Sequence, residues 1–310
     1  MYAIGACVDC VLTGFSSRQG GKMVLDLYED SFGDHRNART LAKASELAYL
    51  PEDLGKAEFA AQLGLDARLI SVGNTQAYIA QNANNIVVAF RGTESPTTFE
   101  GLKDWLLSDA VNLLILPTGR LGTDFAAAGV GARFHQGFIN ALDDIWLPLF
   151  SGVEDEIKRA DRPLWITGHS LGGALAVLST WLFTRKFVNV HQVYTFGGPM
   201  IGNVEASRAF DRELAGKIFR YVNGPDPVPK LPTVSLIAND YGHVQKEMST
   251  GVGPGASSSA ALFADFLSRS ANGVIQGTLV DDVWKAVSQT VEAHLMPSYH
   301  TMIDKLMGKK

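Results

Sequence analysis

The sequence contains few cysteines and no long hydrophobic run. Cys7 and Cys10 are the only cysteines in 310 residues, which excludes a fold held by a framework of disulfide bonds. Their C-x-x-C spacing also occurs in redox and metal-binding motifs, but no second cysteine pair and no histidine before His35 accompany it. We therefore interpret this segment as a small apolar stretch. Because no apolar run approaches the ~18 residues of a membrane-spanning helix, we expect no integral membrane segment.

The sequence also lacks an excess of positive charge. Its 27 Lys and Arg residues are outnumbered by 32 Asp and Glu, which gives a net charge of −5, and it has no basic cluster. These features argue against a nucleic-acid partner and against charge-driven docking to anionic membranes. No basic residue precedes Arg18, whereas a secretory signal carries positive charge before its apolar region. The sequence therefore favours a cytoplasmic protein over a secreted one.

Apolar residues make up 46% of the chain and charged residues 19%, enough to form a sizeable core. Helical spacing of apolar residues predicts helices at 37–50, 51–63, 137–160, 171–187 and 203–215, the third with a break near Pro148. Apolar and β-branched runs predict strands at 69–72, 76–80, 85–90, 163–167, 190–196 and 218–222. Strands that alternate with helices indicate an α/β fold with a mostly parallel central sheet flanked by helices.

We expect a single domain over residues 1–310. The one low-complexity stretch, at 249–261, is rich in Gly and Ser, and a helical pattern follows it. Candidate site residues, described below, occur both before and after this region, and we expect them to meet in space. We therefore interpret residues 249–290 as an insertion within the domain.

Residues 168–172 form a G-x-S-x-G pentapeptide centred on Ser170. A buried strand is predicted directly before it and a helix rich in small residues directly after it. This context indicates a sharp strand-to-helix turn that exposes the Ser170 hydroxyl as a nucleophile. The N–H of Leu171 would then lie at a helix N-terminus, where it can stabilise an oxyanion.

A serine nucleophile needs a base, and the base needs an orienting acid. Asp226 follows a predicted strand in a proline-stiffened loop and is the candidate acid, with Asp240 as the spare. His169 adjoins Ser170 on a tight turn and cannot easily face it. Three other histidines, at 35, 135 and 191, precede Ser170 and suit structural roles better. The base is therefore one of three later histidines: His243, His294 and His300.

Together these residues resemble the class 3, fungal-type lipases of the α/β-hydrolase fold. The resemblance spans residues 87–299 and rests on Ala89-Phe90-Arg91-Gly92-Thr93, Asp104-Trp105, Phe134-His135-Gln136-Gly137-Phe138, Gly168-His169-Ser170-Leu171-Gly172-Gly173, Thr195-Phe196-Gly197-Gly198-Pro199 and residues 226–232. It implies that Thr93 supplies the second oxyanion donor. It also implies that His294, with Tyr299 five residues later, is the base, whereas the Tyr-x-His segment containing His243 is structural. The chain departs from many relatives at Ala293, where they carry Asp.

The resemblance further implies a short helical lid within residues 95–108. Four residues there recur at helical spacing and form one apolar face: Phe99, Leu102, Trp105 and Leu106. In the resembling lipases such a segment covers the nucleophile in water and opens where lipid covers its apolar side. The alternative is a helix packed permanently on the sheet.

These observations predict a carboxylic ester hydrolase, specifically a triacylglycerol-type lipase that acts through a Ser170–Asp226–His294 triad and an acyl-enzyme. A phospholipase A1 and a soluble short-chain carboxylesterase use the same machinery and are the alternatives. A non-catalytic interaction protein related to lipases would be expected to have lost a triad member. The predicted partner is a lipid or ester substrate at a lipid–water interface, and the mechanism requires no metal or organic cofactor.

Overall fold

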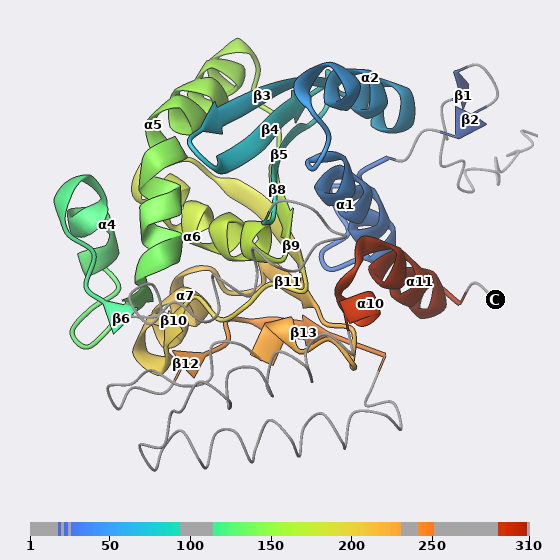
Figure 1. Cartoon of the computed structure of the whole chain (residues 1–310). Helices are drawn as coiled ribbons and strands as arrows, with labels where there is room; N and C mark the ends of the chain where they lie inside the picture. Colours follow the sequence, from blue (N-terminus) through green and yellow to red (C-terminus); the bar gives the residue numbers. More distant parts are fainter. Residues whose placement is uncertain are drawn as a thin grey trace, which may run out of the picture.

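The computed structural model describes residues 18–19, 22–23, 26–93, 114–230, 241–250 and 291–308. Its main element is a seven-stranded sheet in the order β13-β11-β9-β8-β5-β4-β3 (Figure 1). The strands are β3 Asp66–Val72, β4 Thr75–Gln81, β5 Ile86–Phe90, β8 Leu164–His169, β9 Val190–Phe196, β11 Ile218–Tyr221 and β13 Lys246–Met248.

Most of this sheet is parallel. Strands β13, β11, β9, β8 and β5 run in one direction, and β4 and β3 complete the sheet as an antiparallel meander. Every residue of β5 and β8 is buried, as expected for central strands covered on both faces. The predicted α/β fold with a mostly parallel central sheet is confirmed.

Helices cover both faces of the sheet. On one face, α1 (His35–Leu47) and α11 (Met296–Leu306) lie side by side over a core that includes Trp165, Tyr194 and Tyr221. On the other face, α5 (Gln136–Arg159) and α6 (Leu171–Arg185) pack on Ile86, Val88 and Ile166. Alternate residues of β5 and β8 thus enter opposite cores, as the two-residue period of a strand requires.

The remaining elements are short. They are β1 Arg18–Gln19, β2 Lys22–Met23, α2 Glu52–Leu63, β6 Leu114–Ile115, η1 Gly119–Leu121, α4 Gly122–Ala126, β7 Phe134–His135, β10 Gly202–Asn203, α7 Val204–Glu213, η2 Val228–Lys230, β12 Tyr241–Gly242 and α10 Val291–His294. Four of these strands form a second, antiparallel sheet in the order β12-β10-β7-β6, which the sequence patterns did not predict.

The predicted break near Pro148 is wrong, because α5 continues through it from Gln136 to Arg159. Leu149 and Val153 are fully buried on the same face as Ile145, so packing on both sides of Pro148 holds the helix together. The carbonyl oxygen of Gly152 accepts a hydrogen bond from the guanidinium of Arg68 at 2.7 Å, which fixes the second half of the helix to β3.

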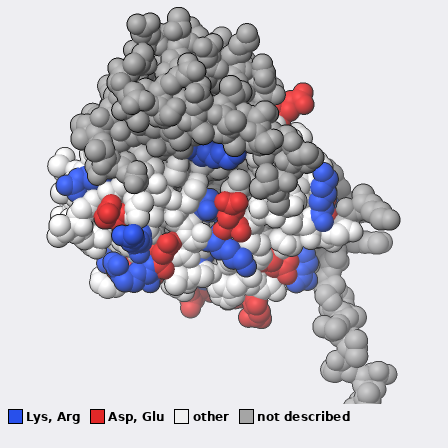
Figure 2. All heavy atoms as spheres, turned by 90° about the horizontal axis from the view of Figure 1, so that it is seen from below, with Lys and Arg blue, Asp and Glu red and all other residues white. Residues whose placement is uncertain are grey.

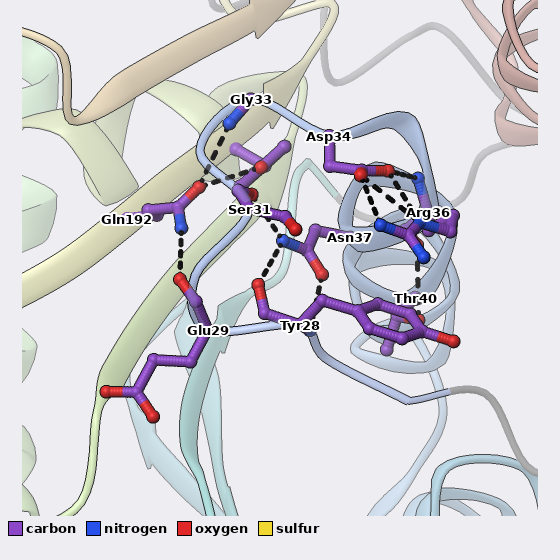
Figure 3. Close-up of polar contacts among 10 residues, drawn as sticks. Tyr28, Glu29, Ser31, Gly33, Asp34, Arg36, Asn37, Thr40 and Gln192 are labelled. Atoms are coloured by element: carbon purple, nitrogen blue, oxygen red, sulfur yellow. Dashed lines mark hydrogen bonds and ion pairs between the residues drawn. The ribbon is translucent and has the colours of Figure 1, made fainter. Parts of the chain in front are cut away.

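The N-terminal part of the described chain is held by buried amide side chains (Figure 3). The amide of Asn37 contacts the backbone of Tyr28 through both its oxygen, at 2.7 Å, and its nitrogen, at 2.9 Å, and it donates to Ser31 O at 2.9 Å. Gln192 on β9 accepts from Gly33 N–H at 3.2 Å. Residues 26–33 are therefore fixed to both α1 and the sheet.

The predicted insertion lies outside the described residues from position 251 on, so the single-domain organisation stays a prediction. Within the described ranges, no helix has the length and apolar character needed to cross a bilayer. On the described part of the face in Figure 2, Lys and Arg side chains alternate with Asp and Glu.

Candidate active site

Ser170 lies at the turn between β8 and α6 with φ 58° and ψ −130°, a conformation that is strained for a residue with a side chain. Its N–H donates to Phe196 O at 2.9 Å, and its hydroxyl is buried with no hydrogen-bond partner among the described residues. A side-chain carbon on Gly168 would lie 2.2 Å from Gly172 O, so the turn can close this tightly only with glycine there.

Asp226 and His294, 68 positions apart in the chain, are in contact. Nδ1 of His294 lies 2.7 Å from Oδ2 of Asp226, and both residues are buried. The other carboxylate oxygen of Asp226 accepts from Val228 N–H at 2.9 Å, which fixes the carboxylate in its loop. An ionised carboxylate only accepts hydrogen bonds, so Nδ1 of His294 carries the proton and Nε2 is the basic nitrogen.

Tyr299 completes the surroundings of Asp226. Its hydroxyl donates to Oδ2 of Asp226 at 2.5 Å, and burial together with the adjacent carboxylate raises the pKa of Tyr299 well above its usual value. Asn223 accompanies it: its N–H donates to Tyr299 Oη at 3.3 Å, and its side chain donates to Ala293 O at 2.8 Å. The sequence pattern marked Tyr299 only by its distance from His294, not by this contact with Asp226.

The other two candidate bases have different partners. Nε2 of His243 lies 2.5 Å from Pro229 O, and burial lowers the pKa of His243 to about 3. Nε2 of His300 lies 2.8 Å from Oε2 of Glu46. Within the described part of the chain, His294 is therefore the candidate that contacts Asp226.

Thr93 and Leu171 both lie at the carboxyl ends of parallel strands. Thr93 is half-buried and follows the last residue of β5, Phe90, by three positions, and Leu171 is the first residue of α6. Phe90 pairs with Gly168 across β5 and β8, and a side-chain carbon on Gly172 would lie 2.4 Å from Phe90 O. The two predicted oxyanion donors therefore lie at the same sheet edge as Ser170.

The sequence patterns missed Gly197 and Tyr49. Gly197 follows β9 with φ 63°, and a side-chain carbon there would lie 2.8 Å from Oδ2 of Asp226 and 2.9 Å from the His294 ring. Its place in the Thr-Phe-Gly-Gly-Pro motif was the available signal. Tyr49 hydrogen-bonds to His169 at 2.8 Å, a contact between segments 120 positions apart that no local pattern shows.

Several predicted residues fall outside the description. The lid at 95–108, with Phe99, Leu102, Trp105 and Leu106, is among them, and so is Asp240. Among the described side chains, no group of three or more His, Cys, Asp or Glu residues could hold a metal ion.

Comparison with known proteins identifies the family. Residues 87–236 match the family Lipase (class 3). The chain is 30% identical over 174 residues to phospholipase A(1) DAD1 of Arabidopsis thaliana, which covers 53% of this chain and 37% of that protein. It is 29% identical over 181 residues to secreted mono- and diacylglycerol lipase 3 of Gibberella zeae. That alignment covers 56% of this chain and 53% of the relative. The segment that matches the class 3 lipase family is just under half of the chain.

Solved structures show the same fold. The crystal structure of Lip2 lipase from Yarrowia lipolytica superposes with a TM-score of 0.56 at 21% identity and covers 71% of this chain and 82% of that chain. A mutant form of MDLA from Penicillium cyclopium gives a TM-score of 0.52 at 20% identity, with 70% and 83% covered. The two curated relatives are matched over about a third to a half of their own length.

Proposed function

We propose that this chain hydrolyses carboxylic esters of acylglycerol lipids, with Ser170 as nucleophile, His294 as base and Asp226 as the orienting acid. The observation that carries the proposal is the 2.7 Å contact between His294 Nδ1 and Asp226 Oδ2. This contact lies near the strained Ser170 turn. A side-chain carbon on Gly197 would lie within 3 Å of both residues of the pair, and Gly197 directly follows Phe196, whose carbonyl oxygen accepts from Ser170 N–H. A serine, an aspartate and a histidine in this chain order are the groups that acyl transfer on this fold uses.

In the acylation step, Nε2 of His294 removes the proton from Ser170 Oγ as the oxygen bonds to the ester carbonyl carbon. The π electrons of the carbonyl move to its oxygen, and the N–H groups of Thr93 and Leu171 stabilise the resulting oxyanion. Asp226 stabilises the imidazolium of His294. When the intermediate collapses, the C–O bond to the alcohol breaks and His294 protonates the leaving alkoxide.

In the deacylation step, water takes the place of the alcohol. His294 removes a proton from the water as the water oxygen attacks the carbonyl carbon of the acyl group bound to Ser170 Oγ. The second tetrahedral intermediate uses the same two oxyanion donors. Its collapse returns the proton from His294 to Ser170 Oγ and releases the carboxylic acid.

Two features support a lipid ester as the substrate. The family is that of class 3 lipases, and the Gibberella zeae relative is a mono- and diacylglycerol lipase. Following the resemblance to the fungal-type lipases, we propose a lipase of the triacylglycerol type, acting at a lipid–water interface with residues 95–108 as its lid. The name of the relative adds mono- and diacylglycerols to the candidate substrates. Phospholipase A1 activity is the second candidate, because the Arabidopsis thaliana relative with that name is 30% identical.

A substrate panel tests the proposal and separates the candidates. Emulsified tributyrin, triolein and phosphatidylcholine are compared for the wild type and for His294→Ala, with His243→Ala and His300→Ala as controls. We expect triolein hydrolysis to exceed phosphatidylcholine hydrolysis, and His294→Ala to lower both at least ~1,000-fold while the controls retain activity.

The other outcomes are equally distinct. A preference for phosphatidylcholine would favour the phospholipase, and hydrolysis of the short-chain ester tributyrin alone would favour a carboxylesterase. If the wild type hydrolyses none of these esters, the proposed function is wrong.

A further inference from the structure

Two side chains outside the proposed triad connect its separate parts. Tyr49 follows the C-terminal end of α1, and His169 is the last residue of β8, next to Ser170. Tyr49 Oη lies 2.8 Å from Nδ1 of His169, and Nε2 of His169 lies 2.7 Å from the backbone oxygen of His294. Both contacts span more than 100 positions of the sequence.

The proton positions in this chain of contacts follow from its ends. The backbone oxygen of His294 can only accept, so Nε2 of His169 carries a hydrogen. Burial lowers the pKa of His169 well below its usual value, so the ring is neutral and Nδ1 is an acceptor. The hydroxyl of Tyr49 must therefore donate to Nδ1 of His169.

The Tyr49 end of this series of contacts lies at the turn before Thr93. A side-chain carbon on Gly92 would lie 2.1 Å from Tyr49 Oη and 2.8 Å from the backbone oxygen of His169, so this glycine turn packs directly against both residues. Hydrogen bonds thus run in one direction from Tyr49 through His169 to the backbone of His294, and Gly92 packs against the Tyr49 end of this path. The path passes beside Ser170, so the oxyanion turn, the nucleophile turn and the base are all attached to it.

We propose that Tyr49 and His169 are positioning residues that fix the distance between the oxyanion turn and the base. This proposal rests on the function proposed above. Neither side chain takes a proton in the proposed mechanism. Because an error of about 1 Å in the placement of catalytic groups can lower a rate about 100-fold, one part-buried and one buried hydrogen bond at this position can control the chemical step.

The neutral state of His169 also matters for the base. The rings of His169 and His294 have centroids 4.5 Å apart. A positive charge on His169 would oppose the imidazolium that His294 forms in both steps, as like charges do at this distance. His169 in its neutral form holds the backbone of His294 without that penalty.

The test compares kcat and KM for a soluble p-nitrophenyl ester among Tyr49→Phe, His169→Leu, His169→Gln and the wild type. Tyr78→Phe is the matched control, since it also removes a tyrosine hydroxyl that hydrogen-bonds to a backbone oxygen, that of Leu50, at 2.9 Å. We expect Tyr49→Phe to lower kcat about 10-fold and His169→Leu at least as much, both with little change in KM. His169→Gln keeps a donor for His294 O and should recover most of the loss.

The outcomes separate this inference from the proposed function. Labelling of the wild type with an organophosphonate, which reacts with a serine nucleophile, is measured alongside. If the wild type is not labelled, the proposed function is wrong, and so is the positioning role that rests on it. If the wild type is labelled but Tyr49→Phe and both His169 variants keep the kcat of Tyr78→Phe, the positioning role alone is wrong. A loss that appears in KM, or one that His169→Gln does not recover, would likewise overturn it.

Discussion

At the scale of single residues, the candidate site depends on glycines that have no room for a side chain, and Gly197 is the one beside the acid and the base. Gly197 adopts φ 63° and lies against the Asp226–His294 pair, so any larger residue would push the acid and the base apart. Its conformation also favours glycine, because a left-handed backbone costs a residue with a side chain about 1–2 kcal/mol.

A comparison of Gly197→Ala with Gly216→Ala separates the clash with the Asp226–His294 pair from the cost of the left-handed backbone. Gly216 has φ 75°, but nothing lies within 4 Å of its missing side chain. We expect both variants to lose about 1–2 kcal/mol of unfolding free energy in urea from the left-handed backbone, and Gly197→Ala to lose more because its side chain also clashes with the pair. Only Gly197→Ala should also lower kcat, by about 100-fold. Equal activity of the two variants would mean that Gly197 does not set the geometry of the pair.

Asp226 gives a second prediction at this scale. Asn in its place can donate to Nδ1 of His294 and so favours the tautomer with the proton on Nε2, where it cannot act as a base. We expect Asp226→Asn to lower kcat for a p-nitrophenyl ester by about 10,000-fold. Asp211→Asn is the control, because the Asp211 carboxylate accepts from Gln245 N–H at 2.6 Å and an asparagine oxygen can do the same. A loss below about 10-fold would contradict the role of Asp226.

The residues that sequence reasoning could find are those with a local signal. Ser170 lies in a pentapeptide between a strand and a helix, and Asp226 lies in a stiff loop after a strand. His294 has no such context, and only the resemblance singled it out from His243 and His300. Tyr49 and His169 act through contacts between distant segments, so no spacing in the sequence could reveal them.

At the scale of elements, the pairing of α1 with α11 supports the site. Helix α11 carries Tyr299 and directly follows the segment with His294, while α1 leads to Tyr49. The pair is joined by His300 and Glu46 at 2.8 Å, and Ser45 on α1 contacts Thr167 on β8 at 2.8 Å. The position of α1 therefore determines where both the base and the Tyr49 hydroxyl lie.

The His300–Glu46 contact makes stability depend on pH. The hydrogen bond from His300 is the largest cause that lowers the pKa of Glu46 to about 2, below the 4.5 of an unperturbed Glu. Since the pKa is depressed in the folded state, the contribution is present above pH 4.5 and is lost as pH falls towards 2.

We expect Glu46→Gln to lower the unfolding free energy by about 1 kcal/mol near pH 6, a modest value because the Glu46 side chain is partly exposed to solvent. The difference from the wild type should vanish near pH 2. Glu52→Gln removes the exposed pair with Lys56 and should change stability by less than about 0.5 kcal/mol. Urea unfolding across this pH range provides the measurement. A difference that persists unchanged at low pH would contradict the account.

Elements with strong local patterns were predicted well. The strands at 85–90 and 190–196 and the helix that begins at Leu171 were all placed within a few residues. Pro148 was misread as a break because local propensity opposes proline within a helix, whereas tertiary packing holds α5 intact. The small antiparallel sheet was missed because each of its strands has only two residues, too few for a periodic signal.

At the scale of the whole molecule, buried amide side chains attach residues 26–33 to the rest of the fold. Asn37 is fully buried and makes three hydrogen bonds to backbone groups of Tyr28 and Ser31. We expect Asn37→Ala to lower the unfolding free energy by about 2–3 kcal/mol, because it leaves these buried groups without partners. Limited proteolysis should then cut residues 26–33 faster than in the wild type. Asn84→Ala, at an exposed turn, is the control; equal cleavage rates would refute the attachment.

In the proposed serine hydrolase site, the end of β8, the loop after β11 and α10 meet and supply Ser170, Asp226 and His294. Mass spectrometry of the chain after reaction with an organophosphonate tests it most directly. The account predicts one adduct per chain, on the peptide that contains Ser170, with no adduct on Ser170→Ala. An adduct on another residue, or undiminished labelling of Ser170→Ala, would contradict it.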